Sequence, residues 1–298
     1  MAIDEIYLKA YGKINLALDV LRKREDGYHD VRMVMQTVGI YDGIEMVKTN
    51  TGKIEIETNL FYLPTDENNI VYRAVKMLFD EFEITSGLTI RLKKFIPVSA
   101  GMAGGSTDAA SVMFGINKMF GLRLSNQQLM ERGVKLGADV PYCIMRGTAL
   151  SEGIGEKLTK LPDMIKCPVL IAKPPVSVST KFVYENLNLS EVTYHPDIDG
   201  MVEAISNGDL AGVARRMGNV LETVTEKEYP VIRELKEIMI DEKALNSLMS
   251  GSGPTVFGLF RTQEEAYNAK ERIKASGITK QAYVTDFYLP IDRKKSVV

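Results

Sequence analysis

The chain has 298 residues and a nearly balanced charge, with 37 Lys+Arg against 39 Asp+Glu. Its length corresponds to about two domains, and a hydrophobic fraction of 45% is enough for a sizeable core. The net charge of −2 argues against a protein that works through a basic field over nucleic acid. Two cysteines and two histidines exclude a disulfide scaffold and a Cys-rich or His-rich metal centre, and they suit a reducing cytoplasm.

The longest apolar runs, such as Pro168–Ala172, are far shorter than the roughly 20 residues of a membrane span. Chemistry in this chain therefore has to rest on Asp, Glu, Lys, Ser, Thr and backbone groups, or on a bound ion.

The first part of the chain is predicted to form strands followed by helices. Alternating apolar residues predict strands at Ile14–Val20, Arg32–Ile40, Gly43–Val47, Lys53–Glu57 and Leu88–Leu92, with a turn at Tyr41–Gly43. Apolar spacings of three and four, together with end signals, predict helices at Asn69–Phe82, at Thr107–Phe120 and, capped by Ser125, through about Lys135.

The second part has a different pattern, and we place the boundary near residue 160, after the glycine-rich segment Ala149–Leu161. Strands are predicted at Cys167–Ala172, Ala244–Met249, Thr255–Phe260 and Gln281–Phe287, and helices at Asp199–Ser206, Asp209–Gly218, Tyr229–Asp241 and Gln263–Ala275. Helices that alternate with antiparallel hairpins indicate a ferredoxin-like layer. The fold class is thus α+β, with an N-terminal domain over residues 1–160 and a ferredoxin-like domain over residues 161–298.

The strongest functional signal is the segment Pro97–Ala110, in which three glycines lie between a strand and a helix. Glycine lets the backbone approach a ligand and adopt positive φ, and the helix start offers free N–H groups and the positive end of its dipole. These features predict a phosphate cradle, with Ser106 and Thr107 adding hydroxyls for phosphate or Mg²⁺. The segment lacks the Walker A Gly-Lys-Ser/Thr and the Rossmann G-x-G start. The alternative is a tight connection with an ordinary N-cap.

Two single residues are candidates for the chemistry itself. Asp139, within Gly137–Pro141, is placed to orient or deprotonate a hydroxyl, although on spacing alone a helix-ending turn is the better interpretation. Lys13 enters the first strand between apolar neighbours, so its ammonium either lies near a site or sits at a strand edge.

Two turns complete the candidate set. Asp26–Asp30 is predicted to be a turn that carries an aromatic ring and an imidazole, and Ser250–Thr255 a glycine-rich hairpin turn. Taken singly, each is compatible with an ordinary surface turn.

Together these segments resemble the GHMP kinase superfamily, whose three motifs are matched in order by Lys13–Val20, Pro97–Ala110 and Leu248–Thr255. Asp26–His29 and Leu136–Pro141 make the chain most similar to the superfamily's kinases of non-mevalonate isoprenoid biosynthesis. The resemblance implies an N-terminal domain like the second domain of ribosomal protein S5. It also implies ATP, Mg²⁺ and a small alcohol substrate bearing a cytidine diphosphate group.

The resemblance further implies roles for individual residues. Asp139 would be the base toward the substrate's 2-hydroxyl, assisted by Lys13, and Ser106 would be the residue nearest the metal. The substrate would be bound by Asn15, Tyr28, His29, Thr180 and Tyr184. ATP would be bound by Pro97, Val98, Ser99, Ala100, Gly101, Met102, Ala103, Gly104, Gly105, Ser106 and Thr107, with Lys94 and Asn69 toward the adenosine.

Three alternatives remain open at this point. One is a GHMP kinase for another alcohol such as homoserine or mevalonate, and another is a nucleotide-binding protein without catalysis. The third is an RNA-binding module, for which the basic clusters Arg22–Arg24 and Arg293–Lys295 are the available support. The near-neutral charge favours solvated surface charge for both clusters, so neither nucleic acid nor membrane is expected as a partner.

Overall fold

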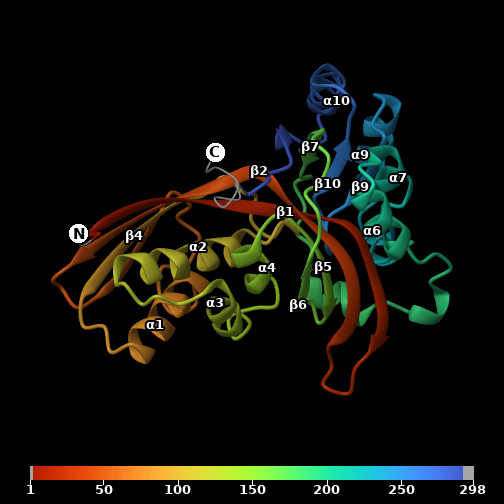
Figure 1. Cartoon of the computed structure of the whole chain (residues 1–298). Helices are drawn as coiled ribbons and strands as arrows, with labels where there is room; N and C mark the ends of the chain where they lie inside the picture. The colour runs from red at the N-terminus through yellow and green to blue at the C-terminus, as the bar shows by residue number, and fades with distance from the viewer. Residues whose placement is uncertain (1–2, 291–298) are drawn as a thin grey trace, which may run out of the picture. The chain divides into compact units, whose positions relative to one another are not determined.

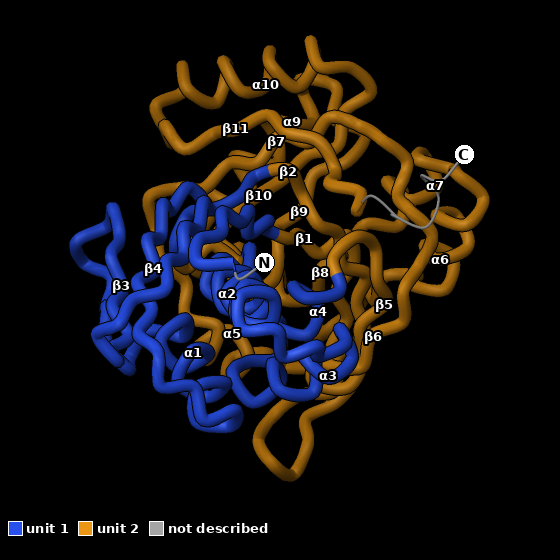
Figure 2. Tube along the Cα trace, turned by 60° about the vertical axis from the view of Figure 1, so that its left-hand side comes forward, with its two compact units in different colours: residues 1–12, 40–98, 102–145 blue, residues 13–39, 99–101, 146–298 orange. Residues whose placement is uncertain are grey.

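A computed structural model of the chain describes residues 3–290. It divides into two compact units that interleave along the sequence (Figure 2). In the described chain, unit 1 holds residues 3–12, 40–98 and 102–145, and unit 2 holds residues 13–39, 99–101 and 146–290. The boundary near residue 160 stays a prediction, because these units follow packing rather than sequence order.

Unit 1 packs helices on a sheet (Figure 1). The long strands β1 (Glu5–Lys23) and β2 (His29–Thr49) each contribute residues to both units, and in unit 1 the second half of β2 pairs antiparallel with β4 (Gly87–Lys93). β3 (Ile54–Thr58) pairs parallel with β4, and α1 (Ile70–Glu81) connects them. Parallel strands cannot be joined by a two-residue turn and need a longer crossover, which α1 provides here.

The centre of unit 1 is α2 (Gly104–Met119), which has buried residues on almost every face. It packs against α1 and against α4 (Val140–Met145), which in turn packs against α3 (Asn126–Gly133). Ser125 caps α3, as the sequence predicts, and forms a capping box with Gln128. A helix buried all round must be placed accurately, because close packing leaves little room for adjustment.

Unit 2 contains a four-stranded antiparallel sheet in the order β11-β7-β10-β9. The strands are β7 (Pro168–Ala172), β9 (Asn246–Met249), β10 (Val256–Leu259) and β11 (Ala282–Asp286). With α9 (Val231–Asp241) before β9 and α10 (Gln263–Ala275) before β11, the order is that of a ferredoxin-like β-α-β-β-α-β layer. The predicted α+β fold with a ferredoxin-like part is therefore confirmed.

Smaller elements complete unit 2. The hairpin β5 (Thr148–Gly153) and β6 (Lys157–Lys160) pairs with the first half of β2, and β8 (Gly218–Asn219) pairs parallel with β1. The remaining elements lie between β7 and α9: α5 (Thr180–Glu185), a 3₁₀ turn (Leu189–Glu191), α6 (Ile198–Ser206), α7 (Leu210–Arg215) and α8 (Glu222–Glu228).

One predicted element is wrong, and two features of the chain were not predicted. The predicted turn Tyr41–Gly43 is absent, since β2 runs unbroken through it with Asp42 fully buried. The glycine-rich segment Ala149–Leu161 contains the hairpin of β5 and β6, whose turn takes up positive φ at Gly153 and Gly155. The helices α4 and α8 were not predicted, because Pro141 and the polar sequence of α8 disguise their starts.

Candidate active site

The glycine loop takes its shape from three residues of positive φ: Ser99 (50°), Gly101 (71°) and Ala103 (55°). Ala103 is the N-cap of α2 in the left-handed conformation, and no side chain accepts a hydrogen bond at this cap. The first N–H groups of a 16-residue helix thus begin directly behind the loop without side-chain competition. This arrangement is suited to an anion such as phosphate, because the helix dipole adds positive potential at the same end.

Several side chains of the loop serve the fold. Ala100 and Met102 are buried, and buried Thr107 donates from its hydroxyl to the Tyr11 carbonyl over 2.8 Å. Contacts to ATP from this part of the loop would therefore come from backbone groups. Gly105 is exposed and Ser106 half-buried, so the start of α2 remains accessible within unit 1.

Beneath the loop lies a buried ionic cluster formed by Asp42, Lys94 and Asp108. The Lys94 Nζ lies 2.5 Å from a carboxylate oxygen of each aspartate. The other Asp42 oxygen accepts the backbone N–H groups of Phe95 and Ile96, at 2.5 and 2.8 Å. The cluster thereby fixes the chain where it leaves β4 and enters the loop.

Burial sets the protonation of this cluster. It raises the pKa of Asp108 to about 8, with Lys94 opposing the shift, and the second oxygen of Asp108 has no hydrogen-bond partner among the described residues. Burial works against the charge of Lys94, but Asp108 and Asp42 together raise its pKa, so the ammonium stays charged.

The two residues predicted to approach the adenosine are both engaged locally. Lys94 is held by the two aspartates. Asn69 is the N-cap of α1, where it accepts from the Val71 N–H at 2.9 Å and donates to the Pro64 carbonyl at 2.7 Å. Their contact with ATP stays a prediction, and any such contact would have to compete with these bonds.

The structure brings Lys13 and Asn15 together in unit 2. Both are buried, and Lys13 donates to the Asn15 Oδ1 over 2.8 Å, which fixes the ammonium on β1. Asp139 belongs to unit 1, half-buried at the start of α4, where its carbonyl accepts from the Cys143 N–H. How Asp139 and Lys13 act together stays a prediction.

The hairpin turn 249–255, which says little by itself in the sequence, contacts two predicted site residues within unit 2 and lies near a third. The Ser250 hydroxyl donates to the Gly101 carbonyl over 3.0 Å. Thr180 and Ser252 share a hydrogen bond of 2.8 Å. A Cβ on Gly251 would lie 3.6 Å from the Asn15 Oδ1. The hairpin therefore links part of the glycine loop, predicted to bind ATP, with residues predicted for the substrate.

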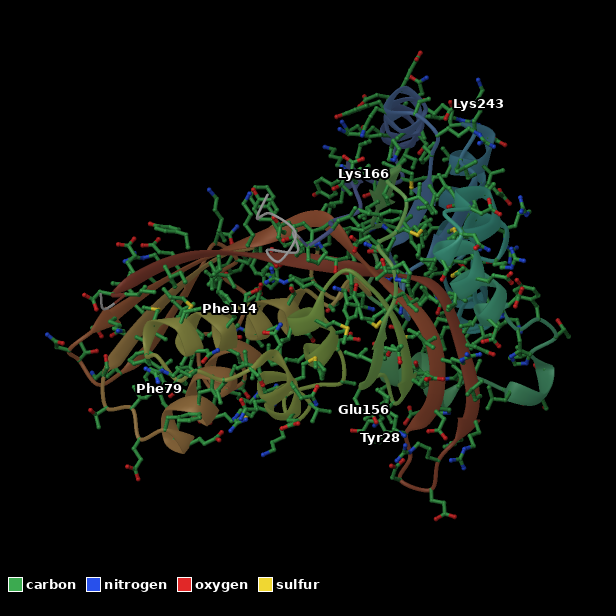
Figure 3. The ribbon with its side chains drawn as sticks, viewed as in Figure 1. Tyr28, Phe79, Phe114, Glu156, Lys166 and Lys243 are labelled. Atoms are coloured by element: carbon green, nitrogen blue, oxygen red, sulfur yellow. The ribbon has the colours of Figure 1, made fainter. Side chains whose placement is uncertain are left out.

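The aromatic residues predicted to bind the substrate lie in unit 2. The rings of His29 and Tyr184 are in contact, with centroids 5.1 Å apart. Tyr28 lies at the end of the β1–β2 hairpin (Figure 3), and 61% of its surface is exposed. Burial, and next the charge of Lys23, lower the pKa of His29, so its imidazole is neutral at pH 7.

Sequence reasoning missed four side chains that hold these groups: Asp42, Asp108, Asn219 and Glu222. Each is polar and at least half-buried, and the contacts that matter for the site join residues 14 to 54 positions apart, so no local pattern reveals them. Asn219 and Glu222 also line a cavity of about 600 Å³ between α8, α9 and β9. None of the predicted ATP or substrate residues lines it.

Two absences bear on the site. Among residues 3–290 no group of three or more His, Cys, Asp or Glu side chains is arranged to hold a metal ion. No helix in that range is both long and apolar enough to cross a membrane.

Comparison with known proteins decides the family. Residues 69–147 match the N-terminal domain of GHMP kinases and residues 201–279 match their C-terminal domain. The chain is 54% identical over 288 residues to the 4-diphosphocytidyl-2-C-methyl-D-erythritol kinase of Lachnospira eligens, covering 97% of this chain and all of that one. The chain belongs to this family of GHMP kinases.

Further relatives agree with this assignment. The kinase of the same name from Lachnoclostridium phytofermentans is 58% identical over 286 residues, which is 96% of this chain and 98% of that protein. The crystal structure of a 4-(cytidine 5'-diphospho)-2C-methyl-D-erythritol kinase superposes with a TM-score of 0.80 at 27% identity, covering 96% of this chain and all of that one. The chain is thus a small-molecule kinase, and ATP is its phosphate donor.

We predict that Lys94→Met lowers the free energy of unfolding by about 3–5 kcal/mol, because it leaves buried Asp42 and Asp108 without their cation. Asp108→Asn should cost much less, since Asp108 is already prone to protonation with its pKa raised to about 8. Urea unfolding of both variants at pH 7 measures the difference. A Lys94→Met protein with wild-type stability and weakened ATP binding would instead show that Lys94 serves the nucleotide alone.

Proposed function

We propose that this chain transfers the γ-phosphoryl group of ATP to the 2-hydroxyl of 4-diphosphocytidyl-2-C-methyl-D-erythritol, in non-mevalonate isoprenoid precursor biosynthesis. The observation that carries the proposal is the uncapped start of α2 behind a loop of positive φ, in a chain whose full-length relatives bear this kinase name. The loop supports binding of the ATP phosphates, and the names of the relatives support the identity of the alcohol substrate.

In this proposal the ATP phosphates lie on the loop 97–107. Phosphoryl transfer has a loose transition state, so catalysis depends on positioning and on neutralising charge at the phosphate oxygens. The backbone N–H groups at the start of α2 supply that charge from fixed positions, because Asp42 holds residues 95–96 and Ser250 holds Gly101. A cradle that is already in place needs no reorganisation when charge develops.

Asp139 would accept the proton of the 2-hydroxyl as it attacks the γ-phosphorus, and Lys13 would stabilise the developing negative charge. The proton passes to the Asp139 carboxylate, and the bond between the γ-phosphorus and the β,γ-bridging oxygen breaks to release ADP. Support comes from placement, since Asp139 is half-buried at the start of α4 and the Lys13 ammonium is fixed by Asn15.

The cytidyl end of the substrate would be bound in unit 2 by Tyr28, His29, Thr180 and Tyr184. The exposed ring of Tyr28 offers a face for stacking, which is worth about 1–3 kcal/mol per base. His29 is neutral at pH 7 and already packs on Tyr184, so the pair forms an uncharged aromatic surface. Asn15 and Thr180 add polar groups for the remainder of the substrate.

The residues present fit a magnesium ion that arrives with ATP. Ser106, at the third position of α2, is half-buried. The Ser106 hydroxyl would add one oxygen ligand to an ion that otherwise keeps waters and binds the nucleotide phosphates. When bound, the ion would neutralise charge on the β- and γ-phosphate oxygens.

The alternatives have less support. Arg22 is paired with Asp30 at 2.6 Å, and Arg24 with Asp26 at 2.8 Å and with Asp30 at 3.2 Å. These aspartates partly neutralise the positive charge that an RNA-binding cluster would need. The cluster Arg293–Lys295 lies outside the described residues. We infer no nucleic acid partner, and a cytoplasmic location that agrees with the two buried free cysteines.

The substrate is tested by coupled ADP release from the purified full chain with ATP and Mg²⁺. We expect turnover with 4-diphosphocytidyl-2-C-methyl-D-erythritol and none above background with mevalonate or homoserine. Turnover with either of the two control alcohols at a comparable kcat/KM would overturn the substrate assignment. No turnover with any of the three would favour a nucleotide-binding protein without catalysis.

We predict that Asp139→Asn lowers kcat at least about 100-fold, because general base catalysis contributes about 10²–10⁴-fold. The dissociation constant of a fluorescent ATP analogue should stay within twofold of wild type. The matched control is Asp80→Asn, at an exposed aspartate of α1 that pairs with Lys76, and it should leave kcat unchanged. Near-normal turnover in folded Asp139→Asn protein would remove Asp139 from the role of base.

A further inference from the structure

Asn219 holds the hairpin 249–253 through its side-chain amide. The Nδ2 group donates to the carbonyls of Met249 and Gly251, at 2.9 and 2.8 Å, and the Oδ1 accepts from the Leu221 N–H at 3.0 Å. Asn219 is buried. Only an amide of this length supplies two donors and one acceptor here, so the position is specific for asparagine.

Glu222, three residues later at the start of α8, binds the same hairpin through the backbone N–H of Met249. Its Oε1 accepts from the Met249 N–H at 2.7 Å, and its Oε2 accepts from Lys236 at 2.7 Å. Burial raises the pKa of Glu222, while Lys236 and the Met249 N–H oppose the shift. Between them, Asn219 and Glu222 bind both the N–H and the carbonyl of Met249.

The tip of the hairpin then acts on Gly101 of the ATP loop. The Ser250 hydroxyl donates to the Gly101 carbonyl. In addition, the two backbone segments approach so closely that a Cβ on Gly101 would lie 2.1 Å from the Ser250 carbonyl oxygen. Ser252 at the same tip bonds to Thr180. A shift of the hairpin would therefore displace Gly101 and Thr180 together.

We propose that Asn219 and Glu222 are positioning residues for the kinase reaction, which act through the hairpin 249–253 on the ATP loop and on Thr180. The inference rests on the proposed function for what the loop and Thr180 bind. In this inference neither residue touches a substrate, because each acts through its hydrogen bonds to the hairpin backbone. Displacement of aligned reactants by about 1 Å can cost on the order of 100-fold in rate, so a small shift at the hairpin is enough to be measured.

The first test is Asn219→Asp, which keeps the size of the side chain but turns a carboxylate oxygen toward the two carbonyls. The matched control is Asn246→Asp at the opposite end of β9, where Asn246 donates to the Ala214 carbonyl at 2.7 Å and accepts from the Ser247 N–H at 2.8 Å. Both changes remove a side-chain amide that donates to backbone carbonyls, one from β8 and one from β9. Kinetics are measured below the melting temperature of both proteins.

We expect Asn219→Asp to lower kcat/KM for both substrates at least about tenfold, and to weaken binding of a fluorescent ATP analogue. Asn246→Asp should stay within twofold of wild type in both measurements, even where its melting temperature falls. A folded Asn219→Asp protein within twofold of wild type would overturn the proposal. So would equal losses in the two variants, since these would indicate a general effect of stability.

A second pair of variants tests the inference if Asn219→Asp does not fold. Glu222→Gln keeps an oxygen for the Met249 N–H, whereas Glu222→Ala removes it, so the glutamine variant should retain at least about tenfold more kcat/KM than the alanine variant. Equal activities would contradict the inference. Binding of the ATP analogue needs no alcohol, so it still tests this inference if the proposed alcohol proves wrong.

Discussion

The contact between Gly101 and the carbonyl of Ser250 is the constraint on which the site depends. Two backbone segments 149 residues apart in sequence approach so closely that no side chain fits at residue 101, and the Ser250 hydroxyl bonds to the Gly101 carbonyl. Gly101 also has a φ of 71°, which glycine adopts without strain. Two independent reasons therefore require glycine at residue 101: its positive φ and its close contact with the Ser250 carbonyl.

This contact is one support of the loop 97–107. Another is Asp42, which receives the N–H groups of Phe95 and Ile96 and shares Lys94 with Asp108. Buried ion pairs add little net stability but become costly when one partner is lost. Their value here is in fixing one conformation for a backbone that we propose to bind phosphate without a lysine of the Walker type. Unit 1 supplies this support, and unit 2 supplies the hairpin.

Much of the fold follows from local sequence. The helix α10 begins and ends as predicted, because Thr262 and Glu265 form a capping box and the apolar spacing continues to its end. The turn predicted at Tyr41–Gly43 is wrong for an instructive reason. Asp42-Gly43 looks like a turn, but the aspartate is buried to receive N–H groups some 50 residues away, which only the tertiary structure reveals.

The candidate site, like the fold, has parts that local sequence predicts and parts that depend on the tertiary structure. The conformation of the loop 97–107 before α2 was predictable, because glycine before a helix start has a direct physical meaning. Asn219 and Glu222 were not, since an asparagine and a glutamate near a helix start suggest caps, and their hydrogen bonds to Met249 and Gly251 depend on the fold. Backbone chemistry can thus be predicted from sequence here, but the side chains that hold the backbone in place cannot.

The most direct measurement of this account is the affinity of Gly101→Ala for a fluorescent ATP analogue, compared with Gly121→Ala. Both glycines have positive φ, 71° and 64°, but a Cβ at residue 121 would meet no atom within 4 Å. Strain from φ is therefore matched, and only the contact with Ser250 differs. We expect at least about tenfold weaker binding for Gly101→Ala and no change for Gly121→Ala. Wild-type affinity in folded Gly101→Ala protein would contradict the account.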